Sequence, residues 1–249
     1  MKTRKATRYV TPLREGGSLP AVVEGDDEGL YVLKFRGAGQ GPKVLVAELV
    51  AGELARAAGM QVPEIVYMEL DTALARTEPD SEIQALIRAS GGLNLALDFL
   101  PGSVMFDPVA DKLEPLLASQ IVWLDAYLSN VDRTARNANM LMWHGQLWLI
   151  DHGAALYFQY AWHGESERAT DPFPRIKDHI LLPYAGALAD ADRIMSERIT
   201  PETIASIVAL VPDSWLDGEP AGAYTDYLVR RLAAPRRFLE EAIRARALL

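Results

Sequence analysis

The chain has 249 residues, with 34 acidic side chains against 25 basic ones and no cysteine. Its hydrophobic and charged fractions, 49% and 24%, are typical of a soluble globular protein. The absence of cysteine excludes disulfides, thiolate metal ligands and cysteine nucleophiles. A net charge of −9 disfavours nucleic acid as a partner, because like charges would repel each other.

Neither a membrane nor a secretory route is indicated by the sequence. No apolar run approaches the length needed to cross a bilayer. The N-terminus, Met1-Lys2-Thr3-Arg4-Lys5, is basic, but a polar stretch follows it where a signal peptide would have an apolar one. We therefore expect a cytoplasmic protein.

Short β-rich runs are predicted from residue 9 to residue 99, with two helices among them. A helix over 43–58 follows from apolar residues that recur at three- and four-residue steps, and Gly59 is placed to cap it. A second helix is predicted before Gly91-Gly92. The predicted strands are 22–23, 30–35, 63–70 and 93–99, the second helix is 81–90, and 14–20 is a predicted glycine turn.

The pattern becomes helical after Pro101-Gly102-Ser103, which is typical of a linker. One hairpin over 138–150 interrupts the helices. The predicted helices are 113–130, 187–199, 201–211, 225–232 and 235–246. This order predicts an α+β, bilobal chain: a β-rich N-lobe over 1–100 with one key helix, and a mainly helical C-lobe over 101–249. A ligand cleft is expected between the lobes.

The densest group of polar residues lies around the predicted hairpin. Asp132 and Asn137 precede it, and Asp151 ends its second strand. Two strands joined by a tight turn bring the start and the finish of a hairpin together, so these side chains can converge. An amide oxygen and a carboxylate suit Mg²⁺ held with phosphates, while the remaining carboxylate can accept a proton from an attacking hydroxyl. This combination favours phosphoryl transfer.

Phosphate charge also has to be balanced in the first lobe. Lys34 lies in the most β-prone run of the chain, and the next element carries Glu48. A pair formed by these two residues would hold the ammonium group where α- and β-phosphates could meet it. Gly16-Gly17-Ser18 could supply backbone N–H groups to the phosphates.

Two motifs in this arrangement resemble a known family. The spacing Asp132–x4–Asn137, followed by a hairpin and Asp151-His152-Gly153, is similar to the catalytic loop and metal-binding triplet of the protein-kinase-like superfamily. The local order Asn130-x-Asp-Arg resembles HipA-like kinases and phosphatidylinositol kinases. A Glu48-bearing helix that leads into Ala-Gly-x-x-Val-Pro-Glu over 58–64 is similar to HipA-like kinases. The resemblance covers 14–153 and indicates a compact HipA-like kinase domain.

This resemblance implies a role for each matched position. Asp132 would be the catalytic base, Lys34 would contact nucleotide phosphates, and Glu48 would orient Lys34. The remaining implied positions are the Mg²⁺ ligands Asn137 and Asp151, the phosphate-covering loop Gly16, Gly17 and Ser18, and the hinge residues Asp98, Phe99 and Leu100, whose backbone would meet adenine.

Simpler interpretations exist for the same residues. Asp132 and Asn137 are common in turns for local reasons, and Lys34 could be a solvated strand residue. Glu53 competes with Glu48 on the same helix, and Gly16-Gly17 could be only a hairpin turn.

Other features are less informative about function. His152 stands where Asp-Phe-Gly has phenylalanine, and His179 has no partner identifiable from the sequence. The C-terminal arginines, Arg231 among them, are predicted to form a solvated face.

The sequence thus predicts a kinase that uses ATP and Mg²⁺ to phosphorylate a hydroxyl group. Its partners would be ATP and an unidentified protein or small-molecule acceptor. Two alternatives stay open: a nucleotide-binding pseudokinase or scaffold without turnover, and an adenylyl transferase that moves a different part of ATP.

Overall fold

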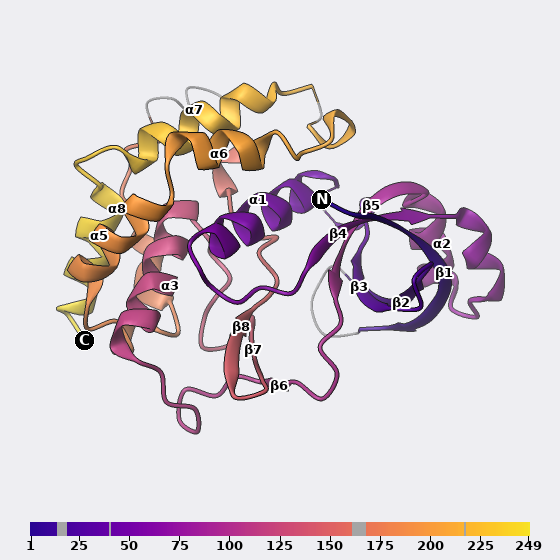
Figure 1. Cartoon of the computed structure of the whole chain (residues 1–249), viewed down its shortest axis with the longest axis horizontal. Helices are drawn as coiled ribbons and strands as arrows, with labels where there is room; N and C mark the ends of the chain where they lie inside the picture. The colour runs from indigo at the N-terminus through magenta and orange to yellow at the C-terminus, as the bar shows by residue number, and fades with distance from the viewer. Residues whose placement is uncertain (14–18, 40, 161–167, 217) are drawn as a thin grey trace.

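A computed structural model describes residues 1–13, 19–39, 41–160, 168–216 and 218–249. The predicted α+β architecture is confirmed: a strand-rich half and a helical half lie on either side of helix α1 (Figure 1). The boundary between lobes 1–100 and 101–249 stays a prediction.

The strand-rich half is a closed barrel with strand order β1-β2-β3-β5-β4. Neighbouring strands are antiparallel except β1 and β4, which close the barrel in parallel where Thr3–Lys5 lies beside Tyr67–Glu69. Alternating apolar residues point into the barrel, where they form a small core of their own. The strands are β1 (Thr3–Pro12), β2 (Ala21–Gly25), β3 (Leu30–Lys34), β4 (Ile65–Leu70) and β5 (Gly92–Asp98). Helix α2 (Ser81–Ala89) packs outside them.

Strand β1 is not among the strands predicted from the sequence, and it begins six residues before the predicted β-rich region. Ala6 is its one buried residue, so the strand lacks the apolar alternation by which half-buried strands are recognised. Backbone pairing with β2 and β4 holds it instead.

Helix α1 (Lys43–Ala57) lies between the two halves. Ten of its 15 residues are buried, and Glu48 is the one charged residue among those ten. A helix that is apolar on all sides must be covered on all sides. Strands β4 and β5 contact it on the barrel side, and helix α6 (Pro201–Val208) contacts it from the helical half. The position of Glu48 is therefore set by packing from both halves.

Helix α3 (Pro115–Leu128) is the centre of the helical half. It contacts α5 (Leu188–Arg198), α7 (Ala221–Leu232) and α8 (Arg237–Arg246). The helix ends at Ser129, whose left-handed backbone turns the chain into the loop that carries Asp132. A small three-stranded sheet combines strands from both sides of α3 in the sequence. Strand β6 (Val104–Met105) follows β5, and strands β7 (Met140–Trp143) and β8 (Gln146–Leu149) follow this loop.

The expectation that the C-terminal arginines form a solvated face is wrong for Arg231. This residue is buried, and its guanidinium donates to the carbonyl groups of Ala126, Tyr127, Ala169 and Asp171. A guanidinium has five N–H donors, so several backbone acceptors can compensate its burial. Sequence periodicity does not reveal acceptors supplied by distant segments.

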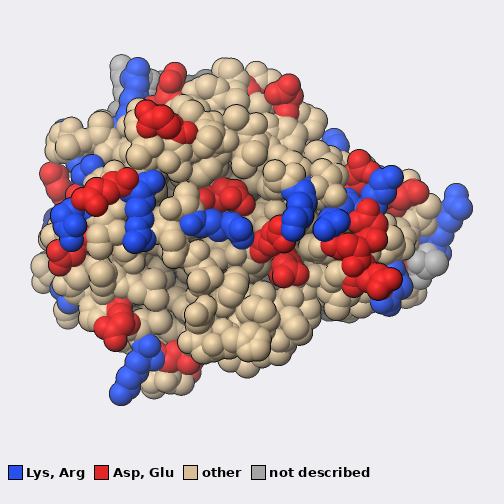
Figure 2. All heavy atoms as spheres, viewed as in Figure 1, with Lys and Arg blue, Asp and Glu red and all other residues tan. Residues whose placement is uncertain are grey.

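One face of the molecule carries charges of both signs (Figure 2). On the face in Figure 2, basic and acidic side chains are interspersed and do not form a continuous basic patch. No helix within the described residues is both long enough and apolar enough to span a membrane.

Close packing of α1 against the barrel gives a first prediction. A Cβ atom on Gly52 would lie 2.5 Å from Cδ1 of Ile65 on β4. The Gly52→Leu substitution should therefore lower the free energy of unfolding by about 1–3 kcal/mol, the usual cost of overpacking. Urea unfolding measures the change.

Gly222→Leu is the matched control, because Gly222 has open space around it in α7, and this variant should be neutral or slightly more stable. Equal effects in the two helices would contradict the packing argument.

Candidate active site

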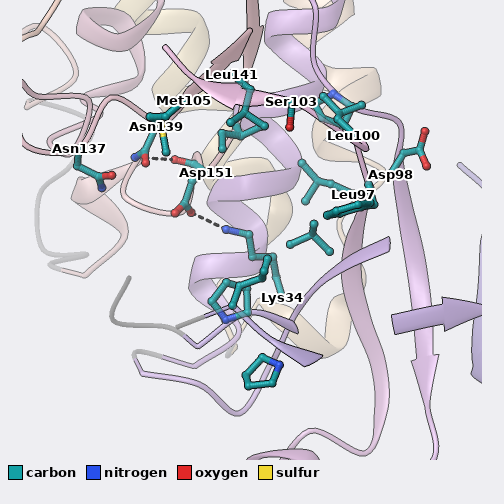
Figure 3. A pocket seen from close by; sticks show the side chains of 17 residues that line it. Lys34, Leu97, Asp98, Leu100, Ser103, Met105, Asn137, Asn139, Leu141 and Asp151 are labelled. Atoms are coloured by element: carbon teal, nitrogen blue, oxygen red, sulfur yellow. Dashed lines mark hydrogen bonds and ion pairs between the residues drawn. The ribbon is translucent and has the colours of Figure 1, made fainter. Parts of the chain in front are cut away.

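A cavity of about 420 Å³ opens between the barrel and the small sheet (Figure 3). Apolar side chains line it from both sides: Val32 and Leu97 come from the barrel, and Met105, Leu141 and Ile150 come from the small sheet or the residue after it. Leu97 and Leu100 lie at one end, which is the apolar one (Figure 3). The other end holds the charged and amide side chains of Lys34, Asn137, Asn139 and Asp151. An apolar pocket with a few polar groups at one end is the usual form of a small-molecule site.

Lys34 ends strand β3 at the polar end of the cavity. Its Nζ lies 2.6 Å from Oδ1 of Asp151 and 3.9 Å from Oε2 of Glu48. Lys34 is only 7% exposed, and burial lowers the pKa of an ammonium group. The carboxylates of Glu48 and Asp151 outweigh that effect, so the net pKa of Lys34 is raised and the side chain stays cationic.

Glu48 is fully buried and lies between two nitrogen-bearing side chains. Besides the Lys34 ammonium, Nδ1 of His152 lies 3.5 Å from Oε1 of Glu48, beyond normal hydrogen-bond distance. Burial alone would raise the pKa of Glu48, but Lys34 and then His152 lower it on balance. Glu53, the competing residue, pairs with Arg56 on the same helix at 3.7 Å. Of the two glutamates, the structure thus places Glu48 beside Lys34.

The loop after α3 brings three polar side chains together at the edge of the cavity. Oδ2 of Asp132 accepts hydrogen bonds from the side-chain amides of Asn137 at 2.6 Å and Asn139 at 3.2 Å. Within the described part of the chain, Oδ1 of Asp132 has no hydrogen-bond donor. The Asp132 carboxylate is therefore fixed through one oxygen, and the other is available to accept a proton.

Asn137 and Asp151 suit a hard cation. Because Nδ2 of Asn137 donates to Asp132, its Oδ1 is the atom left to bind a metal. Oδ1 of Asp151 accepts a hydrogen bond from Lys34, so Oδ2 of Asp151 is the atom left to bind a metal. Among the described residues, no group of three or more His, Asp or Glu side chains is arranged to hold a metal ion by itself. Two oxygen ligands fit Mg²⁺, which keeps waters and takes further ligands from phosphate groups.

Asp98, Phe99 and Leu100 lie at the apolar end of the cavity. The Asp98 and Phe99 backbone N–H groups donate to Glu64 and Leu30 carbonyls. For the Leu100 N–H, no hydrogen bond to any described residue is present. The Asp98 carboxylate points away from Lys34 and Asp151 (Figure 3). Of the three predicted hinge residues, Leu100 therefore has the N–H group available to a ligand.

Gly16, Gly17 and Ser18 lie outside the described residues. The residues on either side of this stretch are placed: the Leu13 N–H donates to the Pro20 carbonyl at 2.7 Å, and both residues line the cavity.

Three residues that support the site were missed by sequence reasoning: Asn139, Asp125 and His179. Asn139 was overlooked because Asn137 already satisfied the expected spacing. Asp125 carried a usable signal, since it is the only charged residue in helix α3. His179 carried none, because Asp125 and Thr134, the two residues that tie it to the loop, lie more than 40 positions away in the sequence.

The buried Glu48 predicts a specific dependence of stability on pH. Its pKa is lowered from 4.5 to about 2, so the ionised carboxylate stabilises the native state above pH 4.5, and this contribution is lost as pH falls toward 2. Glu48→Gln should therefore reduce the loss of unfolding free energy between about pH 6 and about pH 3.

Urea titrations at the two pH values measure this difference, with Glu53→Gln as the control. Burial raises the pKa of Glu53, so removing that carboxyl should leave the acid-induced loss unchanged or slightly larger. A Glu48→Gln protein that loses as much stability in acid as the parent would contradict the assignment of a lowered pKa.

Comparisons with known proteins show the family of the chain and the similarity of its fold. The family model of HipA-like kinases matches residues 7–233. The fold is similar to that of the Helicobacter pylori proinflammatory kinase CtkA, with a TM-score of 0.57, 13% identity, and coverage of 97% of this chain and 98% of that chain. It is also similar to the Golgi casein kinase with Mn/ADP bound, with a TM-score of 0.55, 14% identity, and coverage of 98% and 74%. No curated protein matches the sequence. Because the family model spans most of its length, the chain belongs to the HipA-like kinase family.

Proposed function

We propose that this protein is an ATP- and Mg²⁺-dependent phosphotransferase that moves the γ-phosphoryl group to a hydroxyl of a protein or small-molecule acceptor. The observation that carries the proposal is the meeting of Lys34, Asn137 and Asp151 at one end of the cavity, with Asp132 beside them. Phosphoryl transfer needs little more from a protein than positioning and charge stabilisation, and these groups can provide both.

The apolar end of the cavity suits a nucleobase. Val32 and Leu97 face Met105, Leu141 and Ile150 across it, and a flat ring between such walls would be removed from water. The Leu100 N–H, which has no acceptor among the described residues, is proposed to donate to a ring nitrogen of adenine. Gly16, Gly17 and Ser18 remain our proposal for a phosphate-covering loop, because Leu13 and Pro20 beside them line the cavity.

The polar end of the cavity suits the triphosphate. The Lys34 ammonium can contact phosphate oxygens while its ion pair with Glu48 keeps it in position. Asn137 and Asp151 are proposed to hold Mg²⁺, which would neutralise phosphate charge when bound. The structure of the Golgi casein kinase, a similar fold, holds Mn and ADP, which supports a divalent cation with an adenine nucleotide here.

Asp132 is proposed to be the catalytic base. Its Oδ1 accepts the proton of the acceptor hydroxyl, whose oxygen forms a bond to the γ-phosphorus. The bond between that phosphorus and the β–γ bridging oxygen breaks, and ADP leaves. The amides of Asn137 and Asn139 hold the other carboxylate oxygen, so the base is oriented before the acceptor arrives.

Removing the base should separate turnover from binding. Asp132 does not line the cavity, so Asp132→Ala should leave ATP affinity nearly unchanged while lowering the rate of transfer by roughly 10²- to 10⁴-fold. The measurement is ADP release together with incorporation of label from γ-labelled ATP. Asp190→Ala, which removes an exposed carboxylate on α5, is the control and should retain full turnover.

The same assay distinguishes the competing functions. Near-normal turnover in Asp132→Ala would reject Asp132 as the base. Label incorporated from α-labelled ATP, with none from γ-labelled ATP, would indicate adenylyl transfer instead. Nucleotide binding by the parent protein without ADP release or labelling would indicate a pseudokinase.

Loss of Asp151 should instead weaken binding itself. A ligand that binds only the native state raises its stability, by about 2.7 kcal/mol when present at 100 times its dissociation constant. Thermal unfolding with ATP should show a shift that increases when Mg²⁺ is added, and Asp151→Ala should lose the Mg²⁺-dependent part. Asp226→Ala, an exposed site on α7, should keep it. The same Mg²⁺-dependent shift in Asp151→Ala would exclude Asp151 as a ligand.

A further inference from the structure

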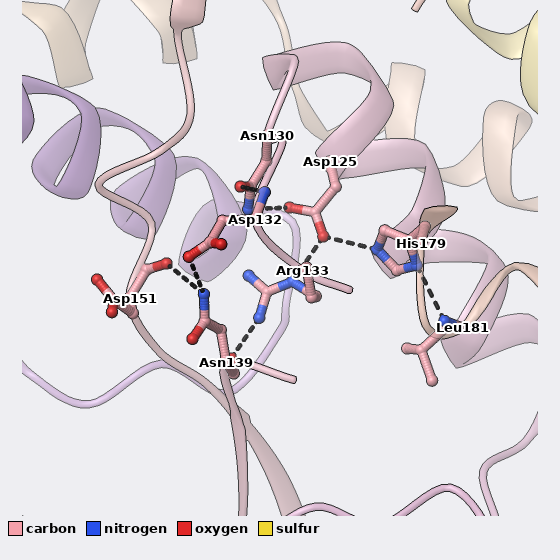
Figure 4. A network of polar contacts seen from close by, with 8 residues as sticks. All are labelled: Asp125, Asn130, Asp132, Arg133, Asn139, Asp151, His179 and Leu181. Atoms are coloured by element: carbon pink, nitrogen blue, oxygen red, sulfur yellow. Dashed lines mark hydrogen bonds and ion pairs between the residues drawn. The ribbon is translucent and has the colours of Figure 1, made fainter. Parts of the chain in front are cut away.

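A buried carboxylate on helix α3 collects hydrogen bonds from the loop that carries Asp132 (Figure 4). Asp125 is 1% exposed. Its Oδ1 accepts from Nδ2 of Asn130 at 2.9 Å, and its Oδ2 accepts from Nε of Arg133 at 2.6 Å and from Nε2 of His179 at 2.9 Å. Three donors from two separate segments therefore bind one carboxylate that does not line the cavity.

Two chains of hydrogen bonds lead from Asp125 to Asp132. In the first, Oδ1 of Asn130 accepts from the backbone N–H of Asp132 at 3.1 Å. In the second, Nη1 of Arg133 donates to the carbonyl of Asn139, whose side-chain amide donates to Oδ2 of Asp132. Asp125 thus reaches both the backbone and the carboxylate of the proposed base.

His179 adds a segment that is distant in sequence to this network. Its Nδ1 accepts from the backbone N–H of Leu181 at 3.0 Å, so the ring proton is on Nε2 and is donated to Asp125. The backbone of His179 forms an isolated β-bridge with Thr134, and the Ile180 N–H donates to the Arg133 carbonyl at 3.2 Å. The 179–181 segment is therefore bound to the loop through side chains and backbone together.

A buried ion pair is not needed for stability alone, because an apolar cluster of equal volume is often as stable. Hydrogen bonds are directional, however, and those from Arg133 and His179 to one oxygen of Asp125 specify how the loop is oriented on α3. A fixed orientation of the loop matters most for a side chain that takes part in the reaction, because a small displacement of a reacting group strongly reduces the reaction rate.

We propose that His179, acting through Asp125, is a positioning residue that holds the Asp132 loop in its reactive arrangement. The inference rests on the proposed function, because it takes Asp132 as the base. Neither Asp125 nor His179 lines the cavity, so their effect should fall on the transfer step and not on nucleotide affinity.

His179 variants test the proposal better than Asp125 variants. Removing the Asp125 charge would leave the buried Arg133 uncompensated and could prevent folding. His179→Ala removes one neutral hydrogen-bond donor. We expect kcat for ADP release from ATP to fall by about 10- to 100-fold, with little change in the KM for ATP. His179→Gln can place an amide nitrogen near the original Nε2 and should restore most of kcat.

The control is Ile176→Ala, at an equally buried position in the preceding 3-10 helix, Pro174–Asp178. This variant should lose stability but keep kcat. An equal loss of kcat in Ile176→Ala and His179→Ala, or no recovery in His179→Gln, would overturn the proposal, because it would show that general destabilisation explains the effect.

Amide hydrogen exchange of the peptide over 130–139 gives a readout that does not depend on activity. Exchange should become faster in His179→Ala and stay at the parent level in His179→Gln and Ile176→Ala. If the parent protein transfers no phosphoryl group, the proposed function fails, while faster exchange confined to His179→Ala still supports the positioning of the loop. Unchanged exchange in His179→Ala would overturn the inference whatever the activity.

Discussion

The buried ammonium of Lys34 is the constraint on which the site depends. A cation with so little exposure is tolerated only if anionic groups surround it, and the two carboxylates that do so come from separate parts of the fold. Glu48 belongs to α1, and Asp151 follows the small sheet. Barrel, helix and sheet must therefore converge at one point, and the cavity lies at that point (Figure 3).

Helix α1 makes this convergence rigid. It is covered by strands β4 and β5 and by helix α6, so Glu48 cannot turn toward solvent without disrupting the core. Helix α3 performs an equivalent role for Asp132, the proposed base. Its buried Asp125 holds the Asp132 loop, as Glu48 holds Lys34. Two buried carboxylates, each on a helix packed on all sides, thus support the two halves of the site.

Much of this arrangement could be predicted because its signals are local. Apolar residues at helical spacing indicated 43–58 and 113–130, and alternation indicated most barrel strands. The spacing of Asp132, Asn137 and Asp151 around a hairpin was enough to expect them to converge, because hairpin geometry depends on short-range pairing. Where the local signal was missing, prediction failed: the exposed strand β1 was not predicted, and the buried Arg231 was expected at the surface.

By itself, the sequence determined the types of elements, the loop with its acidic and amide residues, and the family to which these belong. Only the tertiary structure decided which glutamate lies beside Lys34, which asparagine oxygens are available, and which residues hold the loop of Asp132, the proposed base. Glu48 and Glu53 are both acidic residues on one helix, and packing from both sides determines which of them is buried. His179 acquires a role only when its segment folds back onto Asp125, because hydrogen bonding between distant segments depends on where the backbone brings them.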